Sequence, residues 1–259
     1  MGQLASHIAV NYPLSRIALE LFNEPHVPDS GYSNGSTWAA IQTEIYRAAR
    51  NAAPALLIVL TGDDWGSGHG LSHIIPVEDG APVAYSFHFY EPMPFTHQGA
   101  TWGWSLLQYF KGLTYPCDAA DAAAVEPVIL ASAPDNTTRD QLKSQLDWLG
   151  ATVVNSTRLQ GWMSYVTAWA AAYPQERVLL GEFGVFRQYA PPEGRAAWIR
   201  DVRKITESFG WGWCHWESNR GFGLFNGDQP NMAIFDALID RDATTSVTPI
   251  FTTSISMLD

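Results

Sequence analysis

The sequence predicts an α/β fold in which parallel strands alternate with helices. The first observation is that short apolar runs of strand length recur along the chain, separated by segments with apolar residues at helical spacing. The second is that two of these runs, Arg16–Pro25 and Arg177–Gly184, each lead into a glutamate. Parallel α/β folds place their chemistry at the carboxyl ends of strands, so both glutamates are expected at one end of the sheet.

Composition limits the class of protein. The 259 residues are enough for one domain with a large core. A net charge of −11 argues against nucleic acid and anionic membranes as partners, and no apolar run approaches the ~20 residues of a membrane span. Two cysteines, Cys117 and Cys214, do not make a disulfide framework. Cys214 falls in a predicted buried strand and is expected to be a core thiol.

The first part of the chain contains three predicted strands. Helical spacing predicts a helix at residues 1–11 and another from Trp38 to about Ala53. The second and third strands are predicted at Leu56–Leu60 and Pro82–Tyr90. Alternation along the third strand gives a small, polar face that should look into a barrel: Ala84, Ser86, His88 and Tyr90. The apolar face should pack on helices: Val83, Tyr85, Phe87 and Phe89.

A long connection follows the third strand. Residues Glu91–Pro134 are predicted to be irregular, and a connection of this length is usually functional or mobile. The remaining predicted elements are helices at Thr138–Leu149 and Leu159–Tyr173, the strand with Glu182, a helix at Trp198–Phe209, a strand at Trp211–Trp216 and a helix at Asn231–Ile239. A tail rich in Ser and Thr, residues 241–259, is predicted to be a linker, an edge strand or a disordered end.

The two strand-end glutamates suggest a specific chemistry. Glu24 ends the first strand, where alternation places it on the same face as Glu20 and Phe22. Glu182 ends the fourth. A glycosidase needs two such carboxyl groups, because one protonates the leaving oxygen while the other attacks the anomeric carbon. A simple turn is the competing interpretation of Asn23-Glu24-Pro25.

These two strands closely resemble the acid/base and nucleophile strands of glycoside hydrolase family 5, the cellulase-like enzymes of clan A. The resemblance runs from residue 1 to about Leu238. It implies a (β/α)8 barrel of the TIM type that is incomplete in this chain, with about five β/α units, the fourth to the eighth. Residues 1–240 are then a partial catalytic domain. A fragment, a natural truncation and a barrel completed from elsewhere are the open alternatives.

The resemblance also implies roles for individual residues. Glu24 matches the general acid/base and Glu182 the nucleophile. Asn23 matches the asparagine that hydrogen-bonds the sugar 2-hydroxyl, and Tyr90, in His88-Phe-Tyr, matches the tyrosine that contacts the nucleophile. The arginine that helps hold the family's nucleophile charged has no counterpart here, so Glu182 is expected to protonate more easily.

Three further residues are candidates for contact with a sugar. His88 shares the inward face with Tyr90. Trp216 ends the fifth strand, where the family keeps a tryptophan beneath the sugar at the cleavage point, and Trp65 lies in a loop at a strand end. Core packing is the competing interpretation of both tryptophans. His69, His73 and His97 match no metal-ligand spacing and are expected to be solvated.

The predicted function is a retaining endo-β-glycosidase that hydrolyses a β-glucan of the cellulose or β-1,3-glucan type. Its two carboxyl carbons are then expected about 5–5.5 Å apart. No cofactor or metal is implied, because carboxyl groups fill both roles, and a monomer is expected. A catalytically dead glucan-binding protein and an inactive fragment are the alternatives. Family members are usually exported, which implies a secreted or periplasmic protein, although the start of this chain does not resemble a signal peptide.

Overall fold

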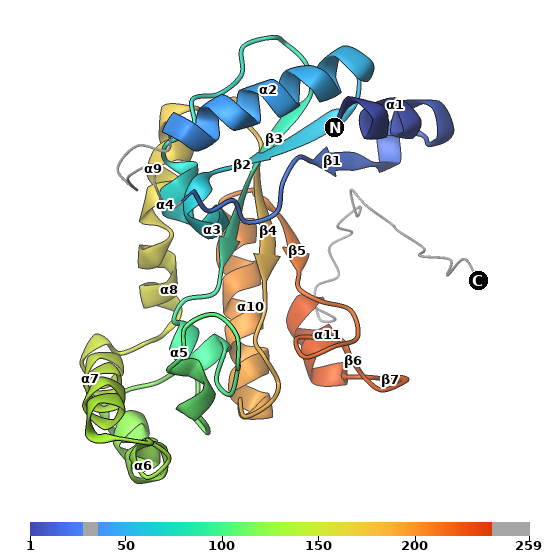
Figure 1. Cartoon of the computed structure of the whole chain (residues 1–259). Helices are drawn as coiled ribbons and strands as arrows, with labels where there is room; N and C mark the ends of the chain where they lie inside the picture. Colours follow the sequence, from blue (N-terminus) through green and yellow to red (C-terminus); the bar gives the residue numbers. More distant parts are fainter. Residues whose placement is uncertain (28–35, 240–259) are drawn as a thin grey trace.

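The computed structural model describes residues 1–27 and 36–239. Its main sheet is parallel, with the strand order β1-β2-β3-β4-β5 (Figure 1). The strands are β1 (Ala18–Glu20), β2 (Leu57–Thr61), β3 (Val83–Phe89), β4 (Val178–Phe183) and β5 (Gly212–His215). A short antiparallel pair follows, β6 (Phe225–Asn226) and β7 (Gln229–Pro230). Neighbouring strands joined through helices are the arrangement of a (β/α)8 barrel, and the predicted five units are confirmed.

The helices lie between and around these strands. They are α1 (Gly2–Asn11), α2 (Ser36–Ala52), α3 (Asp63–Gly66), α4 (Gly68–Leu71), α5 (Met93–Thr96), α6 (Ala119–Leu130), α7 (Asn136–Thr152), α8 (Ser156–Trp162), α9 (Ser164–Ala172), α10 (Pro192–Ser208) and α11 (Met232–Leu238). Two 3-10 turns are η1 (Leu14–Arg16) and η3 (Leu107–Tyr109). None of the described helices is both long enough and apolar enough to cross a membrane.

The apolar face of β3 packs on helices, as predicted. Tyr85 contacts Trp169 of α9, with ring centroids 4.9 Å apart. Phe89 stacks on Trp198 of α10 at 6.0 Å. Both strand residues are buried in the main core. Because side chains alternate along a strand, the opposite face of β3 carries His88 away from these helices.

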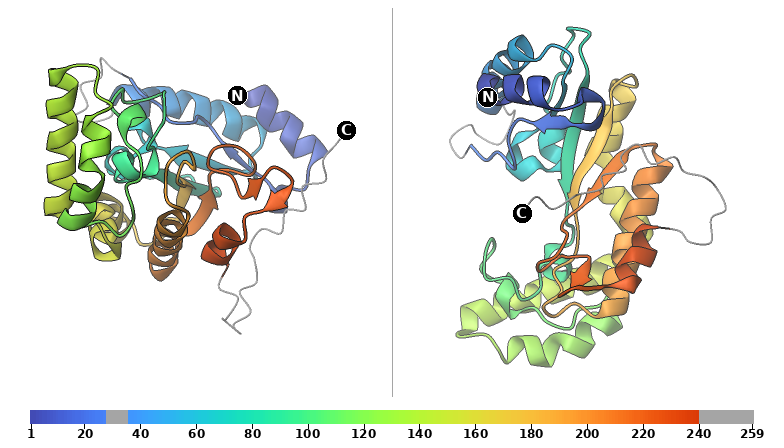
Figure 2. Two further views of the ribbon diagram at one scale, coloured as in Figure 1. Left: turned by 90° about the horizontal axis from the view of Figure 1, so that it is seen from below. Right: turned by 90° about the vertical axis from the view of Figure 1, so that its right-hand side faces the viewer.

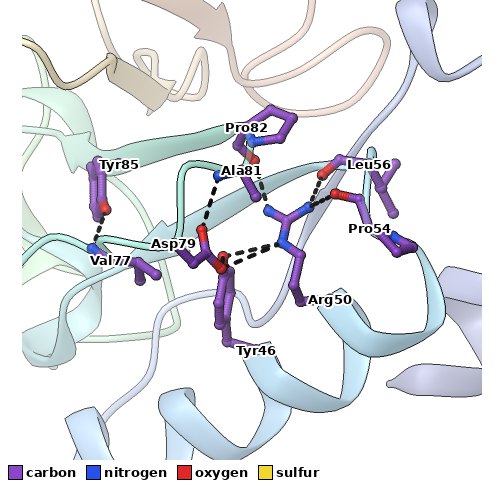
Figure 3. A network of polar contacts seen from close by, with 9 residues as sticks. All are labelled: Tyr46, Arg50, Pro54, Leu56, Val77, Asp79, Ala81, Pro82 and Tyr85. Atoms are coloured by element: carbon purple, nitrogen blue, oxygen red, sulfur yellow. Dashed lines mark hydrogen bonds and ion pairs between the residues drawn. The ribbon is translucent and has the colours of Figure 1, made fainter.

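Arg50 of α2 is hydrogen-bonded to the residues at the amino-terminal ends of two strands (Figure 3). Its guanidinium donates to the carbonyl oxygens of Leu56 and Pro82, which immediately precede β2 and β3. Its Nε donates to the Tyr46 hydroxyl, which in turn donates to Asp79 at 2.6 Å. The fixed fork of an arginine can hold several acceptors at once, so this side chain aligns the helix with both strands.

Strand β1 is shorter than predicted. It ends at Glu20, and Phe22 is exposed and packs on Trp38 with ring centroids 5.5 Å apart. Glu24 has a φ of +44°, which interrupts any extended conformation. The predicted alternation through Phe22 to Glu24 is therefore wrong, and Glu24 lies in a loop beyond the strand.

The connection after β3 contains helices that were not predicted. The longest of them is α6, whose first turn has a capping box: Asp118 accepts from the backbone of Asp121, and Asp121 accepts from that of Asp118. That pair is the sequence signal that could have revealed the helix. Figures 1 and 2 show α6 beside α7, at the opposite end of the molecule from α1 and α2.

Two smaller expectations were also wrong. The helix predicted at Leu159–Tyr173 is divided into α8 and α9, and the break follows shortly after Gly161, a residue that weakens helices. Cys214 lies in β5 as predicted but is exposed, and β5 is an edge strand of the described sheet. The tail at residues 241–259 lies outside the described residues.

Candidate active site

Glu182 is held inside the sheet. It belongs to β4, which lies between β3 and β5, and it is paired in register with His88 after a bulge at Gly181 in β4. The two strands approach each other closely at Gly181. The absence of a side chain there allows this approach, because a β-carbon at Gly181 would lie only 2.2 Å from the Ser86 hydroxyl oxygen. The Glu182 side chain is 14% exposed, so it is largely removed from water yet still open to a ligand.

Four of the predicted site residues come together at the carboxyl ends of β3 and β4. His88 Nδ1 lies 2.8 Å from Glu24 Oε1 and 3.5 Å from Glu182 Oε2. The Tyr90 hydroxyl donates to Glu182 Oε2 at 2.9 Å. One carboxyl oxygen of each glutamate and the His88 nitrogen all lie within 4.8 Å of one another.

The protonation of Glu182 depends on its surroundings. Burial raises its pKa, while the charge of His88 and the hydrogen bond from Tyr90 lower it without cancelling the rise. Burial and the charge of Glu182 raise the pKa of Tyr90, which therefore stays protonated as a donor.

His88 experiences opposing influences. Burial alone would lower its pKa, but the hydrogen bond to Glu24 and the negative charges of Glu182, Glu24 and Glu20 outweigh burial and raise it. A histidine with a raised pKa carries positive charge over a wider pH range. It can therefore balance the charge of the two glutamates between which it lies.

The remaining predicted residues surround this group. Asn23 is exposed in the loop beside Glu24. Trp65 in α3 is exposed, stacks on His26 with ring centroids 4.7 Å apart, and donates its backbone N–H to the carbonyl of Pro25. Trp216 is exposed directly after β5. Neither tryptophan is a core residue in this structure, so both rings are open to a ligand.

The histidines expected in solvated loops are not all solvated. His97 is 8% exposed, and burial lowers its pKa to about 4. His69 and His73 are partly buried and lie 3.2 Å and 3.7 Å from Asp64 and Asp63, respectively. The signal in the sequence that could have indicated His97 is its position shortly after Tyr90, in the long connection that follows β3.

Among the described residues, the one set of three acidic, histidine or cysteine side chains that could surround an ion is Glu24, His88 and Glu182. These are the same groups that acid–base and nucleophilic chemistry on a sugar requires.

An incomplete (β/α)8 barrel with paired carboxyl groups at its strand ends has the architecture of a barrel glycosidase. A family model described as Cellulase (glycosyl hydrolase family 5) matches residues 2–221. The chain belongs to this family.

Individual relatives agree with this assignment. Endoglucanase 3 of Fibrobacter succinogenes is 25% identical over 227 residues, covering 86% of this chain and 33% of that protein. Endoglucanase C of Acetivibrio thermocellus is 26% identical over 214 residues, covering 82% and 57%. The structure of Thermotoga maritima Cel5A in complex with cellobiose superposes with a TM-score of 0.69 at 22% identity, covering 92% of this chain and 64% of that one. The chain thus spans less than two thirds of these proteins.

Proposed function

We propose that this chain carries the catalytic pair of a retaining endo-β-glycosidase acting on a β-glucan. The observation that carries the proposal is the contact set of Glu24, His88, Glu182 and Tyr90 at one end of the parallel sheet. Retaining enzymes keep their carboxyl groups about 5–5.5 Å apart, whereas inverting enzymes separate them by about 6.5–9.5 Å. One oxygen of each carboxyl group lies within 4.8 Å of the other, which is compatible with the closely spaced, retaining arrangement.

The reaction would take two steps. The Glu182 carboxylate attacks the anomeric carbon, and the bond to the leaving oxygen breaks as Glu24 delivers a proton to that oxygen. Glu24, now ionised, then removes a proton from water, whose oxygen attacks the same carbon and releases Glu182. His88 contacts both carboxyl groups and would stabilise whichever is charged at each step.

The substrate class follows from the relatives and from the aromatic residues. Two of the related proteins are endoglucanases, and a structural neighbour was solved with cellobiose. The exposed rings of Trp65 and Trp216 offer flat apolar faces on which the C–H face of a sugar can pack. A polymeric substrate does not enter cells, so we also propose that the protein is secreted or periplasmic, which fractionation of the producing cells would check.

The test uses an aryl β-cellobioside and a soluble β-glucan. Turnover with the first product formed as the β-anomer, observed by proton NMR, supports the proposal, and the α-anomer contradicts retention. An aryl 2-deoxy-2-fluoro-β-cellobioside should label Glu182, as identified by peptide mass spectrometry. Glucan binding with neither turnover nor labelling would instead indicate a catalytically dead binding protein. Neither binding nor turnover would indicate an inactive fragment.

A further inference from the structure

Tyr90 lies just beyond the end of β3, so the hydrogen bonds of the sheet do not hold it in place. Its hydroxyl must lie on Glu182, yet Tyr90 follows Phe89, the last residue of β3. Its backbone N–H bonds to the Glu91 side chain rather than to a neighbouring strand. Because the sheet ladder ends before Tyr90, other groups must hold both its backbone and its ring.

His97 contacts the Tyr90 ring and reaches the Tyr90 backbone through Thr96. Its imidazole meets the Tyr90 ring edge to face, with centroids 5.0 Å apart and planes at 74°. His97 Nδ1 lies 3.0 Å from the Thr96 hydroxyl oxygen, and that hydroxyl donates to the Tyr90 carbonyl. The single hydroxyl proton is used on the carbonyl, so the Thr96 oxygen accepts from His97 Nδ1–H. His97 therefore supports the Tyr90 ring directly and its backbone through Thr96.

The Phe222 ring packs against both Tyr90 and His97. Its ring centroid lies 5.9 Å from that of Tyr90 and 5.2 Å from that of His97. The loop that carries Phe222 is itself held by the buried guanidinium of Arg195, which donates to the carbonyls of Val185 and Phe222. Tyr90 is thus contacted by rings from the loops after β3 and β5.

We propose that His97 is a positioning residue for the nucleophile: it fixes the Tyr90 hydroxyl on Glu182 through its ring and through Thr96. This inference rests on the proposed function, because Glu182 is the nucleophile only in that reaction. His97 does not touch the reacting carbon. It is neutral at ordinary pH, since burial lowers its pKa to about 4, and so it acts by shape and by one hydrogen bond.

Two substitutions separate the two contacts. His97→Phe keeps an aromatic edge on Tyr90 and loses the Nδ1–H donor, whereas His97→Asn keeps a donor near the Nδ1 position and loses the ring. His97→Ala loses both. Phe110→Ala is the matched control, because Phe110 is also buried, belongs to the same connection, and has its ring against Trp104 rather than the catalytic group.

The measurement is the pH profile of kcat/KM on an aryl β-cellobioside. Loss of a hydrogen bond to a charged group should lower the rate of His97→Ala about 10- to 100-fold, and the acidic limb should move to higher pH because Tyr90 no longer lowers the pKa of Glu182. His97→Phe and His97→Asn should fall between this variant and the wild type. His88, Glu24 and Glu20 also influence Glu182, and no variant changes them. Phe110→Ala should lower stability and leave the acidic limb in place.

A structural measurement makes failure of this inference distinguishable from failure of the proposed function. Crystal structures of the wild type and of His97→Ala give the distance between the Tyr90 hydroxyl and Glu182, which is 2.9 Å here. A lengthened distance in the variant supports positioning by His97 even if the wild type hydrolyses nothing. An unchanged distance, or an active His97→Ala with the wild-type acidic limb, overturns the inference and leaves the proposed function standing.

Discussion

The two catalytic candidates are held in different ways. Glu182 lies within a central strand, has a side chain 14% exposed, and is contacted by His88 and by Tyr90. Glu24 lies in a loop beyond the three-residue edge strand β1, with a φ of +44° and a side chain 30% exposed, and its closest partner is His88 at 2.8 Å. The sheet itself therefore orients the proposed nucleophile, whereas the proposed acid depends on a loop and a hydrogen bond.

The largest expected effect comes from removing the less exposed member of this pair, Glu182. Glu182→Gln keeps the shape of the side chain and removes the nucleophile, so the rate on an aryl β-cellobioside should fall at least ~10³-fold. Glu44→Gln is the control, since that side chain is 76% exposed and pairs only with Arg47 in α2. Steady-state kinetics measures both, and an unchanged rate for Glu182→Gln would exclude it as nucleophile.

Removing Glu24, the more exposed member, should give an effect that depends on the substrate. General acid catalysis is worth about 10²–10⁴-fold, so Glu24→Ala should lose roughly that much on a glucan. An activated aryl leaving group needs little protonation and should lose much less. The comparison of the two substrates is the measurement, and equal losses would assign the acid role to another residue.

A smaller effect is expected from changing the groups that control the ionisation of Glu182. Glu182 must be ionised to attack, and its pKa is raised above the ordinary 4.5, so activity should fall as the pH drops through that raised value. Tyr90→Phe removes a hydrogen bond that lowers this pKa, so the acidic limb of kcat/KM should move to still higher pH, with a rate loss of about tenfold. An acidic limb that does not move would separate Tyr90 from the ionisation of Glu182.

The smallest effect on chemistry is expected far from the pair. Arg50→Met leaves the Leu56 and Pro82 carbonyls without their guanidinium donor and should cost about 1–3 kcal/mol of stability, seen as a lower Tm. Activity per folded molecule should not change, because Arg50 lies at the amino-terminal ends of β2 and β3. Val10→Ala in α1 is an exposed control. A specific loss of kcat without a change in Tm would contradict this purely structural role.

Local pattern was sufficient for several features of the site. Alternation along β3 predicted which residues pack on helices and which accompany His88, and the structure confirms this division for Tyr85 and Phe89. The position of Glu182 near the end of β4 came from a short apolar run that leads into an acid, whereas the same pattern placed Glu24 on a strand that ends at Glu20. These features depend on residues adjacent in sequence, whose side-chain directions are set by backbone geometry alone.

The sequence by itself determined the class of fold, the five strands and the two carboxyl groups. Only the tertiary structure decided that β1 ends four residues before Glu24, that Cys214 is exposed and that His97 supports Tyr90. Each of these depends on contacts between segments far apart in the chain, or on whether another strand covers a face. Periodicity records which side of an element is apolar, but the neighbour that meets that side is set by how the whole chain packs.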